Sequence, residues 1–290
     1  MSTNMQGFAG VIGWPLTNTL SPAIHTAALR RLGFDWVYLR FPVPPDQLAN
    51  AVAGLRALGA VGANVTIPHK ETVLAHLDDV SGDAAAVGAV NTIQRVGERL
   101  VGHNTDVDGF REFVAGDAGI RVAGQSVVVL GSGGAARAVV RALDDLGARE
   151  ITIVARSSER GAALSELVGG AAATVEGWDT AGERAASADV VVNATPLGAG
   201  GDDPLAGAAW RPGQVIVDLV YTPPVTPLME AARAGGAESW GGLGMLVRQA
   251  AASLKIWTGQ YPPLEVMSAA AVHAIGPSGS TRPPRLPKED

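Results

Sequence analysis

The sequence predicts an α/β protein with two domains. Short apolar runs alternate with longer alanine- and leucine-rich stretches, one β-branched run leads into a glycine-rich loop, and 290 residues suffice for two domains of ordinary size. We expect a substrate-binding domain over 1–105, a nucleotide-binding domain over 106–240, helices over 241–275 that return to the first domain, and a disordered tail over 276–290.

The first predicted domain begins with a strand, a helix and a second strand. Ser21 is the expected N-cap of that helix, because Pro22 suits the first helical position. In chain order the predicted elements are strand Phe8–Ile12, helix Pro22–Leu32, strand Trp36–Phe41, helix Asp46–Leu58, strand Ala63–Ile67 and the short strands Ala89–Gln94 and Leu100–Gly102. This alternation predicts a parallel or mixed sheet covered by helices.

The second predicted domain repeats the alternation. Its predicted strands are Ser126–Leu130, Ile151–Ala155, Val190–Asn193 and Val215–Leu219, and its predicted helices are Ala135–Leu146 and Glu159–Leu167. The helices expected to return to the first domain are Met245–Trp257 and Pro263–Ala274.

The composition excludes several classes of protein and of site. The chain has no cysteine, which excludes disulfides, thiolate zinc sites and a cysteine nucleophile, and is compatible with the cytoplasm, where we expect the protein. A net charge of −6 argues against a general nucleic-acid binder. We expect no signal peptide, because no basic segment and apolar core open the chain, and no membrane span, because no apolar run reaches about 18 residues. No metal ion is expected.

A glycine-rich loop follows the predicted strand Ser126–Leu130. Gly131 permits a tight turn, Gly133 lets a phosphate approach the backbone, and Ala136 occupies the third position of the G-x-G-x-x-G/A pattern. The helix that follows offers free N–H groups and a partial positive charge. A glycine turn without a ligand is the alternative, but the order of strand, loop, helix and strand indicates a Rossmann-like domain. The expected nucleotide-binding residues of the loop are Gly131, Ser132, Gly133, Gly134 and Ala135.

The end of the next predicted strand favours NADP over NAD. An NAD site usually has Asp or Glu at this position, whereas this chain has Ala155 followed by Arg156. A guanidinium suits a 2′-phosphate, and Ser157 and Arg160 could add a hydroxyl and a second charge. The alternative is that both arginines are solvated loop residues, with Glu159 as an ion-pair partner.

Four polar segments interrupt or follow the apolar strands of the first predicted domain. Ligands of open α/β sheets bind beyond the carboxyl ends of the strands, where we expect all four. Their hydroxyl, amide, ammonium and carboxylate groups suit a polyhydroxylated substrate. The segments are Thr19–His25, Asn64–Lys70, Ala89–Thr92 and His103–Asp106.

Each polar segment also has a purely structural alternative. His25 and His103 are expected to be polar partners rather than catalysts. The alternatives are Ser21 as a helix N-cap, Asn91 as a turn former, Lys70 as a solvated surface lysine and Asp106 as a helix cap.

With these segments in view, the sequence resembles the shikimate dehydrogenase family from about Gly7 to Met267. The motifs that carry the resemblance are Val11–Pro15 with Ser21, Pro22 and His25; Gly62–Pro68 with Lys70; Gly88–Thr92; Asn104–Asp106 with Gly109; Gly131–Ala138; Asn193–Thr195; Asp218 with Tyr221 and Pro223; Gly242–Leu246 with Gln249; and Trp257–Gly259. One such segment is weak evidence, whereas this many in the family's order is strong.

The resemblance implies an N-terminal α/β substrate domain, a Rossmann-like NADP domain and a cleft between them. It implies a cytoplasmic NADP-dependent enzyme, monomeric or homodimeric, that reduces 3-dehydroshikimate to shikimate in chorismate and aromatic amino acid biosynthesis. It implies Lys70 and Asp106 as the catalytic pair. It places substrate contacts at Thr19, Ser21, Thr66, Asn91, Tyr221 and Gln249. It places cofactor contacts, beyond the glycine loop and the arginines, at Thr195, Gly242 and Met245.

The sequence departs from the family's usual pattern at four positions. Thr19 stands where serine is usual, which puts the breadth of accepted substrates in doubt, and Ala155 replaces an asparagine near the adenosine end of the cofactor. Thr26 replaces an asparagine and Pro196 a serine.

Three rival functions share parts of this pattern. A quinate/shikimate dehydrogenase, or a relative acting on an amino analogue, would share the fold and the mechanism. A methylenetetrahydrofolate dehydrogenase would leave Thr19, Ser21 and Asn91 without a role. A sensor that binds NADP or shikimate without turnover would not need Lys70 and Asp106.

Overall fold

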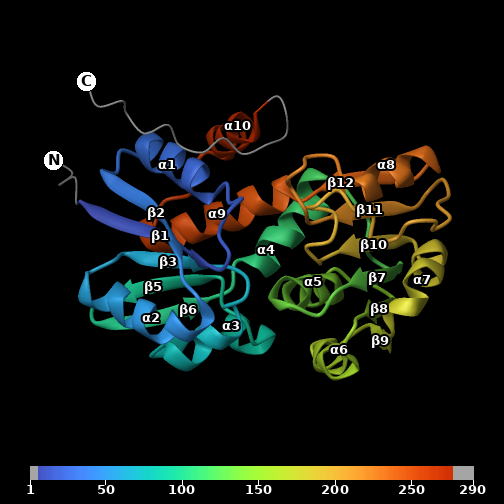
Figure 1. Ribbon diagram of the computed structural model, residues 1–290, viewed down its shortest axis with the longest axis horizontal. Coiled ribbons are helices and arrows are strands. Elements are labelled where there is room, and N and C mark those ends of the chain that lie inside the picture. The colour runs from blue at the N-terminus through green and yellow to red at the C-terminus, as the bar shows by residue number, and fades with distance from the viewer. Residues whose placement is uncertain (1–5, 277–290) are drawn as a thin grey trace.

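A computed structural model describes residues 6–276 of the chain. Two six-stranded sheets stand side by side, each with helices on its faces, and the long helix α9 (Leu243–Thr258) runs between them (Figure 1). The tail predicted to be disordered lies, apart from Gly276, outside the described residues.

The first sheet is mixed, in the strand order β2-β1-β3-β5-β6-β4. Strands β1, β2 and β3 are parallel to one another, whereas β5 is antiparallel to both β3 and β6. Its strands are β1 Gly7–Gly13, β2 Trp36–Pro42, β3 Gly62–Val65, β4 Asp79–Val80, β5 Thr92–Val96 and β6 Arg99–His103. The two reversals bring the start of β5 to the edge of the sheet where β1 and β3 end.

Helices cover both faces of the first sheet. On one face α1 (Ser21–Leu32) packs against α10 (Leu264–Ile275) and α9. On the other lie α2 (Leu48–Ala57) and α3 (Gly82–Val87), with 3-10 turns at Pro45–Gln47 and Thr72–His76 (Figure 1). The last two described helices, α9 and α10, thus pack on the same face of the first sheet as α1.

The second sheet is entirely parallel, in the order β12-β11-β10-β7-β8-β9. Its strands are β7 Ser126–Leu130, β8 Glu150–Val154, β9 Ala172–Glu176, β10 Val190–Asn193, β11 Val215–Asp218 and β12 Glu238–Gly241. Its helices are α5 Gly134–Asp145, α6 Ser158–Ser165, α7 Ala181–Ser187 and α8 Pro227–Ala234, with a 3-10 turn at Trp178–Thr180. A parallel sheet buried on both faces explains the unbroken β-branched run of β7, every residue of which is buried.

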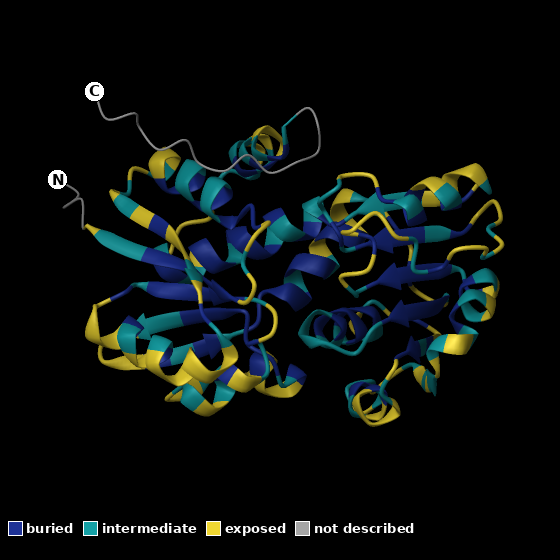
Figure 2. Cartoon of the chain, in the orientation of Figure 1, coloured by how far each residue is buried: buried dark blue, intermediate teal, exposed yellow. Residues whose placement is uncertain are grey.

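The two sheets are joined by α4 (Asp106–Arg111), which continues into a π-helix at Glu112–Asp117. Helix α9 packs along both segments, and Figure 2 shows the middle of α4 and of α9 buried at the centre of the molecule. Arg248 on α9 forms ion pairs with Glu112 and Asp117 of the π-helix. Contacts among α4, the π-helix and α9 thus join the two halves of the molecule.

Several local predictions are wrong in detail. Ser21 is the first residue of α1 rather than its N-cap, and the hydroxyl of Thr19 accepts a hydrogen bond from the Ser21 N–H instead (3.2 Å). The strand predicted from Ala89 begins at Thr92. The helix predicted at Asp46–Leu58 starts as a 3-10 turn. Four short helices, of six to eight residues, and three edge strands were not predicted: α3, α4, α7, α8, β4, β9 and β12.

Candidate active site

A cavity of about 430 Å³ opens between the two sheets, and its walls come from both. The loops at one edge of the first sheet form one wall. Ala135 in the first turn of α5, the segments after β10 and β11 and the start of α9 form the other, whereas Gly131–Gly134 lie outside the lining. The lining of this cavity includes twelve residues that the sequence predicts as site residues: Thr19, Ser21, Thr66, Lys70, Asn91, Asp106, Ala135, Thr195, Tyr221, Gly242, Met245 and Gln249.

The topology explains how four distant polar segments meet. Segments after β1, β3 and β6 lie at the carboxyl ends of their strands, as expected. Asn91, by contrast, precedes β5 rather than following a strand. It reaches the same edge because β5 runs antiparallel to β3 and β6. The expectation that all four segments follow strand ends is therefore wrong for this one, although the meeting point is as predicted.

Lys70 and Asp106 form an ion pair in the cavity wall. The Lys70 ammonium lies 2.5 Å from Oδ2 of Asp106, and the two side chains are only 14% and 5% exposed. Lys70 is thus not a solvated surface lysine. Asp106 begins α4 without capping it, since its own N–H is held by the side chain of Asn104 (3.0 Å). A buried ammonium and carboxylate in contact can hold a proton at a defined place beside a bound molecule.

Asn91 fixes the other oxygen of the carboxylate. Its Nδ2 donates to Oδ1 of Asp106 (2.8 Å), and its Oδ1 accepts from the backbone N–H of Thr105 (2.8 Å). Gln249 lies 3.3 Å from the same Nδ2. Asp106 therefore has one oxygen on Lys70 and one on Asn91, which fixes its orientation in the cavity.

Tyr221 enters the cavity from the opposite wall. Its hydroxyl donates to the backbone oxygen of Asn18 (3.4 Å). Burial raises the pKa of Tyr221 above its usual value, and the charge of Arg40 offsets this only in part. The phenol therefore stays protonated near neutral pH and is available as a hydrogen-bond donor.

A buried polar layer behind the cavity was not predicted. The Asn64 side chain accepts from the hydroxyl of Tyr38 (2.7 Å) and donates to Ser253 on α9 (3.0 Å). His25 stacks on Tyr38 with ring centroids 4.1 Å apart and hydrogen-bonds the Ser21 carbonyl through Nδ1 (2.9 Å). The signal for this layer was a serine on the apolar face of α9. His25 is a polar partner, as expected, and so is His103, which lies 3.2 Å from Gln94.

The glycine loop has the geometry of a phosphate cradle. Gly131 has φ +107° and turns the chain at the end of β7; a Cβ there would lie 2.9 Å from Thr195. A Cβ on Gly133 would meet open space, and no side chain caps the twelve-residue helix α5 at this end. The first N–H groups of α5 thus face a position that an anion can occupy.

The loop also touches the lysine. A Cβ on Gly134 would lie 2.9 Å from Cβ of Lys70, so only glycine fits at this position. The glycine loop and the predicted catalytic lysine are therefore packed directly on each other across the cavity.

The residues expected at the adenosine end lie outside the cavity lining. Arg156 follows β8 and is exposed, and Ser157 caps α6 by accepting from the N–H of Arg160 (3.3 Å). The guanidinium of Arg160 pairs with Glu71 (2.6 Å), not with Glu159. Helix α6 therefore presents two cations at its start, which fits a phosphate on the cofactor ribose.

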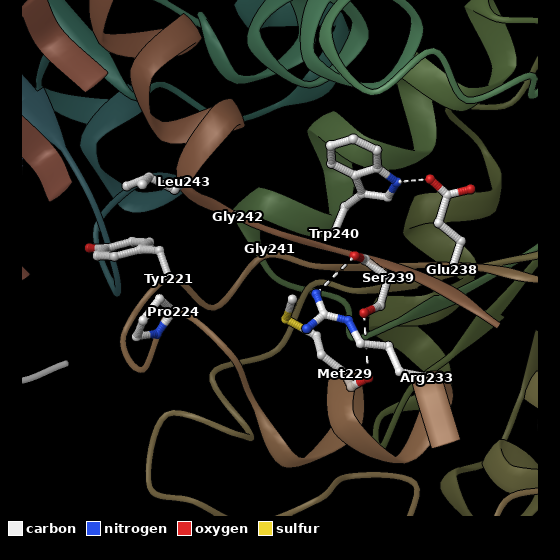
Figure 3. Close-up of a pocket in the computed structure, with 10 residues that line it drawn as sticks. All are labelled: Tyr221, Pro224, Met229, Arg233, Glu238, Ser239, Trp240, Gly241, Gly242 and Leu243. Carbon is white, nitrogen blue, oxygen red and sulfur yellow. Dashed lines mark hydrogen bonds between the residues drawn. The ribbon is translucent and has the colours of Figure 1, made fainter. Parts of the chain in front are cut away.

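A second cavity, of about 360 Å³, adjoins the first at Tyr221 and Gly242 (Figure 3). Its charged groups bond to its own walls: Arg233 donates to the Ser239 carbonyl, and Glu238 accepts from the indole of Trp240. It lacks a facing lysine and carboxylate like those of the first cavity, which is the better candidate for chemistry.

The part of the chain that the structure describes, residues 6–276, contains no cluster of three or more metal-binding side chains. Within the same residues no helix is long and apolar enough to cross a membrane.

Three family models match separate parts of the chain. Residues 11–93 match the shikimate dehydrogenase substrate binding domain, residues 114–198 the shikimate / quinate 5-dehydrogenase model, and residues 242–272 the shikimate 5'-dehydrogenase C-terminal domain. The matches thus cover both walls of the cavity.

Individual relatives match over nearly their whole length. The NADP(+) shikimate dehydrogenase of Citrifermentans bemidjiense is 42% identical over 94% of this chain and 97% of the relative. The Thermus thermophilus enzyme, solved with NADP(H) and shikimate, has a TM-score of 0.82 and is 36% identical over 92% of this chain and 99% of its own. The Corynebacterium glutamicum quinate dehydrogenase, solved with NAD, has a TM-score of 0.83 and is 31% identical over 93% and 100%. In both sequence and fold, this chain belongs to the shikimate dehydrogenase family of NADP-dependent enzymes.

Proposed function

We propose that the protein catalyses the reversible NADPH-dependent reduction of 3-dehydroshikimate to shikimate, a step of chorismate and aromatic amino acid biosynthesis. The observation that carries the proposal is the buried Lys70–Asp106 pair, which lies in a cavity between a polar wall and a glycine loop. The family membership supports the same reaction.

In this proposal Lys70 handles the proton. The bound cofactor supplies or accepts the hydride. The substrate oxygen gains negative charge as its carbonyl is reduced, and the Lys70 ammonium can donate a proton to it or stabilise its charge. Asp106 holds Lys70 through Oδ2 and is held by Asn91 through Oδ1, so the ammonium is oriented before the substrate arrives.

The polar wall would hold the substrate. Ser21, Thr66 and Gln249 line the cavity with hydroxyl and amide groups, and Tyr221 adds a protonated phenol from the opposite side. A small molecule with one carboxylate and several hydroxyls can satisfy these groups together. Thr19 and Asn91 complete the proposed set.

The residues of the second sheet fit NADP. The uncapped start of α5 suits the pyrophosphate, and Arg156 and Arg160 suit the 2′-phosphate, with Ser157 between them. The nicotinamide would lie at the cavity end formed by Thr195, Gly242 and Met245, close to Lys70. We infer a compact enzyme with one domain for substrate and one for cofactor, divided near residue 105 and again near residue 240.

A quinate/shikimate dehydrogenase is the second candidate. Thr19 lines the cavity with one methyl group more than the serine usual in the family, and a quinate dehydrogenase shares the fold. An extra methyl group in a substrate pocket changes selectivity by roughly tenfold or more.

The substrate and the cofactor are tested together in four reactions of the purified protein. Shikimate or quinate is oxidised with NADP+ or NAD+, and formation of the reduced nicotinamide is followed by its absorbance. The proposal predicts strong turnover only with shikimate and NADP+. Comparable rates with quinate or NAD+ would select the second candidate, and absence of turnover in all four would overturn both.

A further inference from the structure

The start of α6 is linked to the other side of the cleft by one ion pair. Arg160 lies on α6, beside the second sheet, and its Nη2 is 2.6 Å from Oε1 of Glu71. Glu71 belongs to the first sheet's half of the molecule and directly follows Lys70. The Glu71 carboxylate, from the first sheet's half, is thus paired with Arg160, one of the two cations suited to a ribose phosphate.

Hydrogen bonds of the two preceding residues fix the position of the Glu71 backbone. The carbonyl of Lys70 accepts from the N–H of Val90 (2.8 Å), and the ring of His69 hydrogen-bonds the carbonyl of Val43 (2.7 Å). The backbone on the N-terminal side of Glu71 is therefore anchored at two points. The glutamate side chain can move, since it is 40% exposed, but its charge stays near α6.

We propose that Glu71 is a specificity-determining residue for the cofactor, which lowers the preference for a dinucleotide with a 2′-phosphate over one with a free 2′-hydroxyl. The inference rests on the proposed contact between Arg160 and that phosphate. A 2′-phosphate must displace the Glu71 carboxylate from the guanidinium and then lie beside it, whereas a 2′-hydroxyl need do neither.

The expected change in NADP+ affinity is small because the Glu71–Arg160 ion pair is exposed to solvent. Both partners are in contact with solvent, with side chains 53% and 40% exposed, so the pair is worth little and the repulsion is screened. We therefore expect removal of the Glu71 charge to tighten NADP+ binding about threefold and to leave NAD+ binding unchanged. Raising the salt concentration should reduce the difference, because exposed charges are screened.

The test is calorimetric titration of NADP+ and of NAD+ into the wild type, Glu71→Gln, Arg160→Gln and the double variant. Asp145→Asn is the matched control, since it removes one partner of an exposed ion pair, with Arg141, elsewhere on the second half. Glu71→Gln should lower the Kd of NADP+ about threefold, Arg160→Gln should raise it, and Glu71→Gln should have a smaller effect in the Arg160→Gln background, where only the repulsion remains. The control should bind like the wild type.

The possible negative results overturn either the role of Glu71 or the contact between Arg160 and the 2′-phosphate. An unchanged or raised Kd of NADP+ in Glu71→Gln overturns the role of Glu71, and so does an equal gain for NAD+. An Arg160→Gln variant with unchanged NADP+ binding overturns the contact on which the inference rests. Because binding is measured without turnover, these results are independent of whether shikimate is the substrate.

Discussion

At the scale of single residues, burial raises the pKa of two side chains in and near the cavity, Tyr221 and Asp218. Tyr221 is kept a donor by burial. Asp218 at the end of β11 has its pKa raised chiefly by burial, and hydrogen bonds from Thr226, Val220 and Asn193 oppose this rise. Such residues hold the walls of the cavity in place without taking part in proposed proton transfer.

His25 makes the folded state sensitive to acid. Burial lowers its pKa to about 4 from an ordinary 6.5, and the hydrogen bond to Ser21 offsets this in part. Between these values the unfolded chain binds a proton at His25 that the folded chain does not. The free energy of unfolding should therefore fall as pH drops through this window, by about 3 kcal/mol from this group.

Urea unfolding at several pH values from neutral to pH 4 measures this contribution. In His25→Phe, which keeps a ring against Tyr38, the fall with decreasing pH should be smaller than in the wild type. His273→Gln, which changes an exposed histidine, should keep the wild-type slope. Equal slopes in all three proteins would show that His25 titrates normally.

At the scale of elements, the walls of the cavity depend on how strands end. Asn193 at the end of β10 donates to Oδ1 of Asp218 at the end of β11 (2.9 Å). The Thr226 hydroxyl donates to Oδ2 (2.7 Å) and also caps α8 by accepting from the N–H of Met229. The Thr226 hydroxyl thus links the start of α8 to Asp218 at the end of β11, which in turn bonds Asn193 at the end of β10.

Replacing this hydroxyl by a methyl group in Thr226→Val should cost about 2 kcal/mol of the free energy of unfolding, because a buried carboxylate loses a donor and α8 loses its cap. Thr174→Val is the control, since Thr174 is exposed and bonds only to Thr152. Chemical denaturation of both variants measures the loss. A cost as small as that of the control would mean that water replaces the hydroxyl.

The sequence predicts long, periodic elements well and short ones poorly. The strand β7 and helix α5 appear within a residue of their predicted bounds, because an apolar run and a glycine loop mark both. Helix α3 has six residues and β12 four, too few for a hydrophobic period to emerge. Ser21 was misassigned because α1 already begins at Ser21; its N-cap is Leu20, whose apolar side chain gives no capping signal.

At the scale of the whole molecule, function depends on two halves held face to face. Lys70 packs on Gly134, Glu71 reaches Arg160, and the side chain of Arg137 donates to the Val87 carbonyl, all across the cleft. These contacts join segments far apart in the sequence. Motifs predicted many of the residues that line the cavity, but cross-cleft pairs have no periodic signal, so the Glu71–Arg160 pair could not be found from sequence.

The direct test of the account is the effect of Lys70→Ala on kcat and KM for shikimate oxidation with NADP+. We expect kcat to fall by roughly 10² to 10⁴, the usual contribution of a positioned acid or base, while KM stays within a few-fold. Circular dichroism and NADP+ titration of the same variant confirm that it is folded and binds cofactor. Near-normal kcat in a folded variant would contradict the assignment of Lys70, and with it the proposed mechanism.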